Sequence, residues 1–143
     1  MRRLNLALTA ACIFAAPAFA NVIIVDGDTL RIDDETIRIV EIDTPETFRS
    51  RCENELILGL KAKERLRALV DSGAVSYEPT GTDRYGRILA RLFVQQEHRR
   101  INIGETLITD GHALRYHSGS EAKIARLRVW CGPHAELGDT WKH

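Results

Sequence analysis

One stretch, residues 26–46, constrains the fold most, because it alternates short β-branched runs with carboxylates at the points where the runs end. Its Asp26-Gly27 pair is flanked by two such runs, a pattern typical of a tight turn between paired strands. The next run is rich in isoleucine and stops before Pro45, which restricts the preceding residue to extended geometry. We therefore predict a meander of three strands, at 22–25, 29–32 and 36–42.

Two acidic residues, Asp28 and Asp43, stand at neighbouring strand ends in this meander. Adjacent carboxylates repel each other, and a bound cation relieves that repulsion. Carboxylate and carbonyl oxygens are the ligands that Ca²⁺ prefers. The Asp26-x-Asp28 pattern is not that of an EF-hand, because Leu30 and Arg31 occupy positions where that loop needs a ligand and a glycine. The sequence therefore predicts a Ca²⁺ site of another kind at this corner.

Two arginines and a further carboxylate accompany the predicted metal site. Arg38 lies inside the third strand, and its planar, permanently charged guanidinium is suited to gripping two phosphate oxygens. Arg87 stands directly before another β-rich run, and Glu46 is a carboxylate beyond those assigned to the metal. A simpler interpretation of Arg38 is an ion pair at the rim of the sheet. Together, these residues predict a metal site beside two arginines that bind phosphate.

Four motifs in this chain resemble the staphylococcal-nuclease (thermonuclease) family, in the family's order and at compatible spacing. They are DGDT at 26–29, IR at 37–38, IDTPE at 42–46 and DRYGR at 83–87. The resemblance extends more loosely from about residue 22 to residue 130. It implies a Ca²⁺-dependent phosphodiesterase acting on DNA and RNA, with single strands favoured, that breaks the 5′ P–O bond and leaves a 3′-phosphate.

The resemblance also assigns roles to individual residues. It implies that Asp28, Asp43 and the backbone carbonyl of Thr44 hold Ca²⁺. It implies that Arg38 and Arg87 bind the phosphate and that Glu46 activates water. Tyr116 resembles the ring that stacks on the substrate base, although the local alignment needs a gap, and an ordinary surface tyrosine is the alternative. Tyr85 is a second candidate for substrate contact, with turn chemistry at Tyr85-Gly86 as the alternative.

The first 20 residues have the pattern of a cleavable secretory signal: two arginines, an apolar run, and an Ala-Phe-Ala end. We expect cleavage after Ala20, no stable membrane association afterwards, and a periplasmic or secreted monomer. The rest, 21–143, has the length of one domain, and we expect a mobile tail from Gly132. With 20 basic and 20 acidic residues the chain is near neutral, which argues against tight nucleic-acid binding but is compatible with turnover of a weakly held substrate.

Two cysteines, Cys52 and Cys131, remain after the predicted cleavage, in a compartment that permits disulfides. A bridge between them would close a loop of about 80 residues and stabilise the fold by roughly 4 kcal/mol in the chain-entropy model. Two unrelated thiols are the alternative.

The remaining pattern completes an α+β, mainly β fold. We expect helices at 56–71, 101–110 and 121–130 and further strands at 74–78 and 87–94, with a turn-rich connection at 79–83. Five short strands capped by about three α-helices are typical of a small OB-type β-barrel, which the family resemblance also implies. Glu41 departs from the family pattern, and we expect it to meet an arginine or the rim, because an unpaired buried carboxylate is costly.

A non-catalytic OB-type module that binds nucleic acid or protein is the main alternative function. A structural domain that binds Ca²⁺ only for stability is another. Loss of Glu46, Arg38 or Arg87 would have favoured these alternatives, and all three residues are present.

Overall fold

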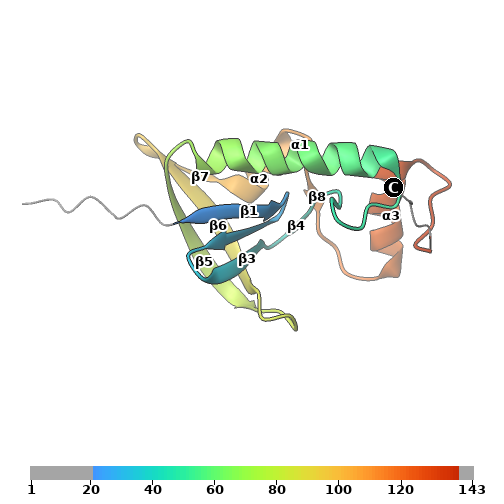
Figure 1. Ribbon diagram of the computed structural model, residues 1–143, viewed down its shortest axis with the longest axis horizontal. Helices are drawn as coiled ribbons and strands as arrows, with labels where there is room; N and C mark the ends of the chain where they lie inside the picture. The colour runs from blue at the N-terminus through green and yellow to red at the C-terminus, as the bar shows by residue number, and fades with distance from the viewer. Residues whose placement is uncertain (1–20, 139–143) are drawn as a thin grey trace, which may run out of the picture.

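The computed structural model describes residues 21–138, so the predicted signal segment and residues 139–143 lie outside the described part. The described chain alternates strands with three helices (Figure 1). In order, the elements are β1 (Val22–Asp26), β2 (Thr29–Ile32), β3 (Glu35–Ile39), β4 (Ile42–Asp43), α1 (Glu53–Val70), β5 (Ala74–Thr82), β6 (Ile88–Gln96), β7 (Arg99–Asn102), α2 (Ile103–Thr109), β8 (Leu114–Arg115) and α3 (Ser120–Cys131).

Six strands form one mixed sheet in the order β1-β2-β3-β6-β5, with β7 paired to β6. The first three strands are the predicted antiparallel meander, and β3 pairs with β6 in parallel. β4 and β8 form a separate antiparallel pair. This is the OB-type α+β arrangement predicted from the sequence. Asp28 lies in the turn before β2, and Asp43 lies at the end of β4.

The structure differs from the sequence prediction in several segments. The strand predicted at 36–42 is divided into β3 and β4, because Glu41 adopts a positive φ of 69° between them, and α1 begins at Glu53 and not at residue 56. β5 continues through 79–82, where a turn-rich connection was predicted, because a bulge between Pro79 and Gly81 accommodates the proline within the ladder. β7 was not predicted, and the second predicted helix therefore starts at Ile103 and not at residue 101. Ile101 belongs to β7, and Asn102 caps α2 by accepting a hydrogen bond from the backbone N–H of Glu105 at 3.1 Å.

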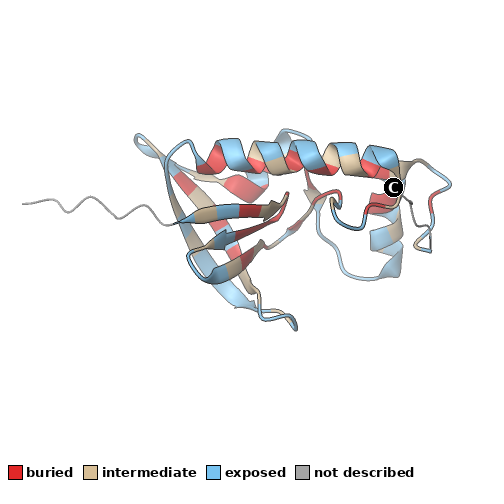
Figure 2. Cartoon of the chain, in the orientation of Figure 1, coloured by how far each residue is buried: buried red, intermediate tan, exposed pale blue. Residues whose placement is uncertain are grey.

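The hydrophobic core lies between the sheet and the face of α1 that points toward it. Figure 2 shows the buried residues of α1 on its side toward the sheet and α2, while its outer side is exposed. Apolar residues alternate along the strands and recur at helical spacing along α1, so each element presents one apolar face. Fully buried members of the core include Leu30, Ile37, Ile39, Leu66, Leu92, Ile103 and Leu107.

α1 continues past the sheet and meets α3, which lies beyond the β4–β8 pair (Figure 1). Leu127 and Trp130 of α3 are buried. Residues 132–138 form turns, and Ala135 among them is buried and accepts a hydrogen bond from Arg128 at 3.3 Å. No helix within residues 21–138 is long and apolar enough to cross a bilayer.

Candidate active site

The turn between β1 and β2 and the end of β4 bring Asp28 and Asp43 to one arginine. Arg38 donates from Nη1 to Oδ2 of Asp28 at 2.7 Å and from Nη2 to Oδ1 of Asp43 at 3.2 Å. The pairing of Thr29 with Arg38 across β2 and β3 sets this arrangement, because it places Asp28 next to the strand position of Arg38. The two carboxylates are therefore close together, as the sequence pattern predicted.

Gly27, in the same turn, is required by packing. A Cβ atom there would lie 2.8 Å from the Cβ of Ala62 on α1 and 2.8 Å from Oγ1 of Thr44. Real Cβ atoms do not approach other atoms so closely. The glycine thus lets the turn that carries Asp28 press against both α1 and the segment that follows β4.

Burial and charge act against each other at the Asp28–Arg38 pair. Burial raises the pKa of Asp28 above its ordinary value, although Arg38 and a 2.8 Å hydrogen bond from Thr29 Oγ1 favour the ionised form. Burial disfavours the charged form of Arg38, but the surrounding carboxylates, first Asp28 and then Asp43, raise its pKa on balance. The site is therefore a buried cluster of opposite charges.

Glu46 lies at the solvent-exposed edge of this cluster and lines the same pocket as Asp28 and Arg38. Its carboxylate is partly enclosed by surrounding protein atoms, and this desolvation, followed by the negative charges of Asp26, Asp28 and Asp43, raises the pKa of Glu46 to about 7. A carboxylate held near neutral pKa is suited to accepting a proton from water.

The loop that carries Glu46 is fixed by a buried carboxylate that the sequence analysis missed, Glu55 of α1. Glu55 is fully buried and accepts from the backbone N–H of Arg51 at 2.5 Å and from that of Glu46 at 3.5 Å. Thr47 also donates to Asp26 at 3.1 Å. Glu55 stands directly before the helix predicted at 56–71, so no pattern in the sequence reveals that α1 starts at Glu53 and includes it.

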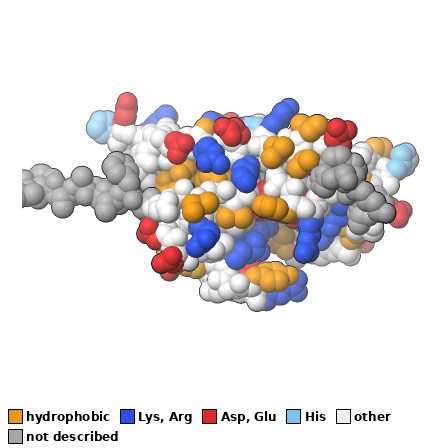
Figure 3. Space-filling view, viewed as in Figure 1, with side chains coloured by type: hydrophobic (Ala, Val, Ile, Leu, Met, Phe, Trp, Pro, Cys, Tyr) orange, Lys and Arg blue, Asp and Glu red, His pale blue; other side chains and the backbone are white. Residues whose placement is uncertain are grey.

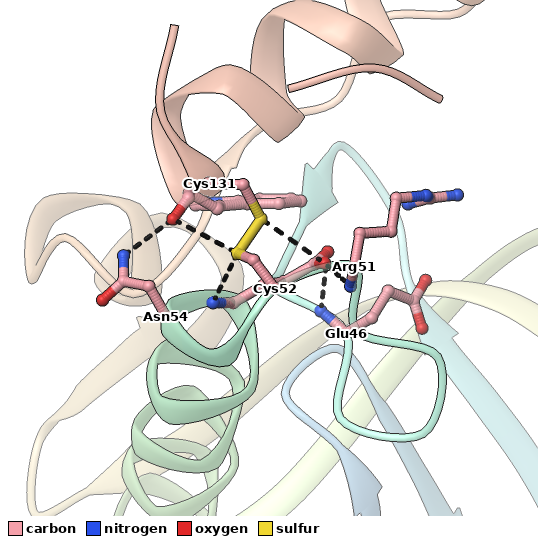
Figure 4. Close-up of a disulfide and its surroundings, with 7 residues drawn as sticks. Glu46, Arg51, Cys52, Asn54 and Cys131 are labelled. Carbon is pink, nitrogen blue, oxygen red and sulfur yellow. Dashed lines mark hydrogen bonds between the residues drawn. A yellow bond between two sulfur atoms is a disulfide. The ribbon is translucent and has the colours of Figure 1, made fainter. Parts of the chain in front are cut away.

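The predicted disulfide between Cys52 and Cys131 is confirmed, with Cα atoms 5.8 Å apart and a sequence separation of 79 residues. Figure 4 shows the bridge joining the start of α1 to the end of α3, next to the segment that bears Glu46 and Arg51. Asn54 adds a second link between the same helices by donating to the carbonyl of Trp130 at 2.7 Å. The bridge therefore links α1 to α3, and it lies beside the loop that carries Glu46.

Replacing Cys131 by serine is expected to lower the free energy of unfolding by roughly 2–5 kcal/mol, because the open chain regains the entropy of a long loop. Chemical denaturation of the bridged wild type and of the variant, both without reductant, measures the difference. Ser118→Ala, an exposed substitution outside the bridge, is the control. Equal denaturation midpoints for wild type and Cys131→Ser would contradict the structural role of the bridge.

Arg87 is held by the DRYGR segment between β5 and β6. Its Nε donates to Oδ2 of Asp83 at 2.7 Å, and its backbone N–H donates to Oδ1 of Asp83 at 3.0 Å. Tyr85 donates to the same carboxylate through its backbone N–H at 2.9 Å, and Gly86 supplies the left-handed turn with a φ of 80°. Desolvation of Asp83 is outweighed by these hydrogen bonds, which lower its pKa. The segment thus presents Arg87 toward Arg38.

The aromatic candidates lie beside the arginines. The Tyr116 ring centroid is 5.9 Å from the Arg38 guanidinium carbon and 5.1 Å from that of Arg126. The exposed Tyr85 ring lies over Arg84 at 4.8 Å and near Arg87 at 5.7 Å. Both tyrosines therefore adjoin the arginine cluster, at positions suited to contacting a substrate base.

Arg126 of α3 is a further site residue that the sequence analysis missed. It is 7% exposed, donates from Nε to Oδ2 of Asp43 at 2.7 Å and from Nη1 to the carbonyl of His117 at 3.0 Å. Its position, 83 residues after Asp43, gives no local signal, because an arginine on a charged helix resembles a solvated surface residue. Glu41, by contrast, meets Arg91 at 2.8 Å at the surface, as expected.

Most of the candidate residues line two adjoining pockets, whereas Asp43 and Tyr85 are in the lining of neither. The first, about 350 Å³, includes Asp28, Arg38, Thr44, Glu46 and Arg87 in its lining. The second, about 300 Å³, shares Arg38 and Arg87 and includes Tyr116. Figure 3 shows Lys and Arg side chains gathered on one face between the sheet and α3. An anionic substrate would meet positive charge there despite the neutral composition of the whole chain.

Comparison with known proteins agrees with this geometry. Residues 36–130 match the family model described as Staphylococcal nuclease homologue. The chain is 29% identical to Protein ParB of Escherichia coli, over 95% of this chain and 86% of that protein. It is 28% identical to the Micrococcal nuclease of Shigella flexneri, over 91% of this chain and 84% of that protein.

A third relative is an uncharacterized protein of Methanocaldococcus jannaschii, 30% identical over 74% of this chain and 62% of that protein. The family match includes Arg38, Glu46 and Arg87, and these comparisons support a nuclease-type function. Because the match spans more than half of the sequence, the chain belongs to the staphylococcal nuclease homologue family.

Proposed function

We propose that this protein is a Ca²⁺-dependent nuclease that hydrolyses phosphodiester bonds of DNA and RNA. The observation that carries the proposal is the convergence of Arg38, Arg87, Glu46 and Asp28 on one pocket of about 350 Å³. Two arginines suit a phosphate, and a carboxylate of raised pKa suits an attacking water. Family membership and the likeness to a Micrococcal nuclease support the same assignment.

The residues present fit a calcium ion. Asp28 and Asp43 offer carboxylate oxygens close enough to share one guanidinium, and the buried Thr44 follows directly with its backbone carbonyl. This all-oxygen donor set suits Ca²⁺ and leaves places for water and substrate oxygens. When bound, the ion would supply electrostatic stabilisation of the phosphate charge.

The protein's own side chains perform the remaining chemistry. Glu46 takes a proton from the attacking water as the new bond to phosphorus forms, and the bond from phosphorus to the leaving 5′ oxygen breaks. That oxygen then takes up a proton from solvent, so the products are a 3′-phosphate and a 5′-hydroxyl. Arg38 and Arg87 donate to the equatorial oxygens, where negative charge grows in the transition state. Asp83 keeps the planar Arg87 guanidinium aimed at the pocket.

The proposed enzyme acts outside the cytosol, as a periplasmic or secreted monomer. The signal-like pattern of residues 1–20 supports this location. The Cys52–Cys131 bridge supports it independently, because disulfides persist mainly in oxidising compartments.

The experiment that tests the function is incubation of purified residues 21–143 with end-labelled single-stranded DNA and RNA in millimolar Ca²⁺. We expect both to be cut, and the new ends to carry 3′-phosphates. Binding without cleavage would instead support the non-catalytic OB-type module.

A further inference from the structure

The exposed aromatic ring of Phe48 lies at the edge of the catalytic pocket and has no role in the proposed hydrolysis. It is 71% exposed, although exposure of a large apolar ring to water is unfavourable. It lines the pocket that contains Glu46 and Arg87. Val129, which is also strongly exposed at 65%, lines a different pocket.

The segment that carries Phe48 is firmly held. Thr47, directly before it, donates to Asp26, and Ser50, two residues after it, is buried. Glu55 then fixes the backbone on both sides, at Glu46 and at Arg51. A ring on a fixed loop loses little conformational freedom when a flat partner binds, so the loop suits a stacking platform.

Positive charge adjoins the ring as well. The Nζ of Lys63, on α1, lies 5.8 Å from the Phe48 ring centroid. A nucleotide stacked on Phe48 would therefore have an ammonium group near its base. Aromatic rings interleaved with cations are the usual means of binding single-stranded nucleic acid without sequence preference.

The two pockets place an aromatic ring on either side of the arginines that they share. They share Arg38 and Arg87, but Phe48 lines only the first and Tyr116 only the second. The phosphate-binding arginines thus lie between two aromatic rings. A phosphodiester held by these arginines would place the nucleoside on one side near Tyr116 and the nucleoside on the other side near Phe48.

We propose that Phe48 is a base-stacking subsite on the side of the cleaved phosphate opposite to Tyr116, so that the preferred substrate is a single strand with nucleosides on both sides of the phosphate. This inference rests on the proposed nuclease function. Bases in a duplex are paired and stacked and cannot lie on the ring without unpairing, which gives the subsite its preference for single strands.

Phe48→Ala tests the subsite, with Phe48→Tyr as the variant that keeps a stacking ring and Val129→Ala as an exposed apolar control. Binding is measured in Ca²⁺ on the slow Glu46→Gln background, with a single-stranded octamer that contains 2-aminopurine, whose fluorescence is quenched by stacking. We expect Phe48→Ala to weaken binding about 5- to 100-fold and to reduce the quenching. Phe48→Tyr and Val129→Ala should remain within about two-fold of the parent protein.

Turnover of the same octamer by the corresponding variants with Glu46 intact gives the second measurement. We expect KM to rise in Phe48→Ala, with a smaller change for a duplex of the same sequence. Unchanged binding and KM in Phe48→Ala would overturn the subsite. That result differs from failure of the nuclease function, in which the protein with both Phe48 and Glu46 intact cuts no nucleic acid at all.

Discussion

Excess EGTA is expected to abolish hydrolysis of single-stranded DNA and RNA by residues 21–143, and added Ca²⁺ is expected to restore it. The two carboxylates and one carbonyl assigned to the ion are fewer oxygens than calcium takes, so water and substrate must complete the shell. Binding should therefore be weak, and millimolar Ca²⁺ should be required. Cleavage of a labelled oligonucleotide over a Ca²⁺ titration measures this requirement.

The control is circular dichroism in EGTA, because the hydrophobic core contains no part of the metal site and the fold should remain intact. A folded protein that lacks activity in EGTA and regains it with Ca²⁺ supports a role in the reaction. Undiminished hydrolysis in chelator would contradict the calcium assignment.

Glu46→Gln is expected to lower kcat by at least about 100-fold, since a positioned general base contributes roughly 10²–10⁴ in rate. The amide keeps the size of the side chain but accepts no proton from water. The side chain is exposed and makes no hydrogen bond among those found in the described chain, so folding should change little. Steady-state cleavage at saturating single-stranded DNA measures kcat, with Glu64→Gln on the exposed face of α1 as the matched control. Equal kcat values for wild type and Glu46→Gln would exclude the general-base role.

The features that the sequence predicted correctly have local signals. The Asp26-Gly27 turn, the isoleucine-rich third strand and the proline after Thr44 are all recognised within a few residues. Together they place Asp28 and Asp43 on adjoining strand ends, and the structure joins both to Arg38. The four motifs, in their order, carried the resemblance to the family, and the family match over residues 36–130 confirms it.

The features that the sequence did not predict depend on contacts between distant segments. Arg126 reaches Asp43 from the last helix, and Glu55 reaches back to the loop before its own helix. β7 was missed because its hairpin turn contains Glu97, which adopts a positive φ of 49° without the glycine or asparagine that usually marks such a turn. In each case tertiary structure, and not local preference, decides the outcome.

The central claim is that Glu46 and Arg87 act on the transition state, and comparison of cleavage with binding tests it most directly. Arg87→Lys keeps the charge but loses the planar guanidinium that Asp83 orients. Single-turnover cleavage and equilibrium binding of one oligonucleotide are measured for wild type, Glu46→Gln and Arg87→Lys at fixed salt and Ca²⁺. We predict that both variants lose far more in cleavage rate than in affinity, because interactions made mainly in the transition state appear in the rate. Near-wild-type cleavage rates in both variants would contradict the account.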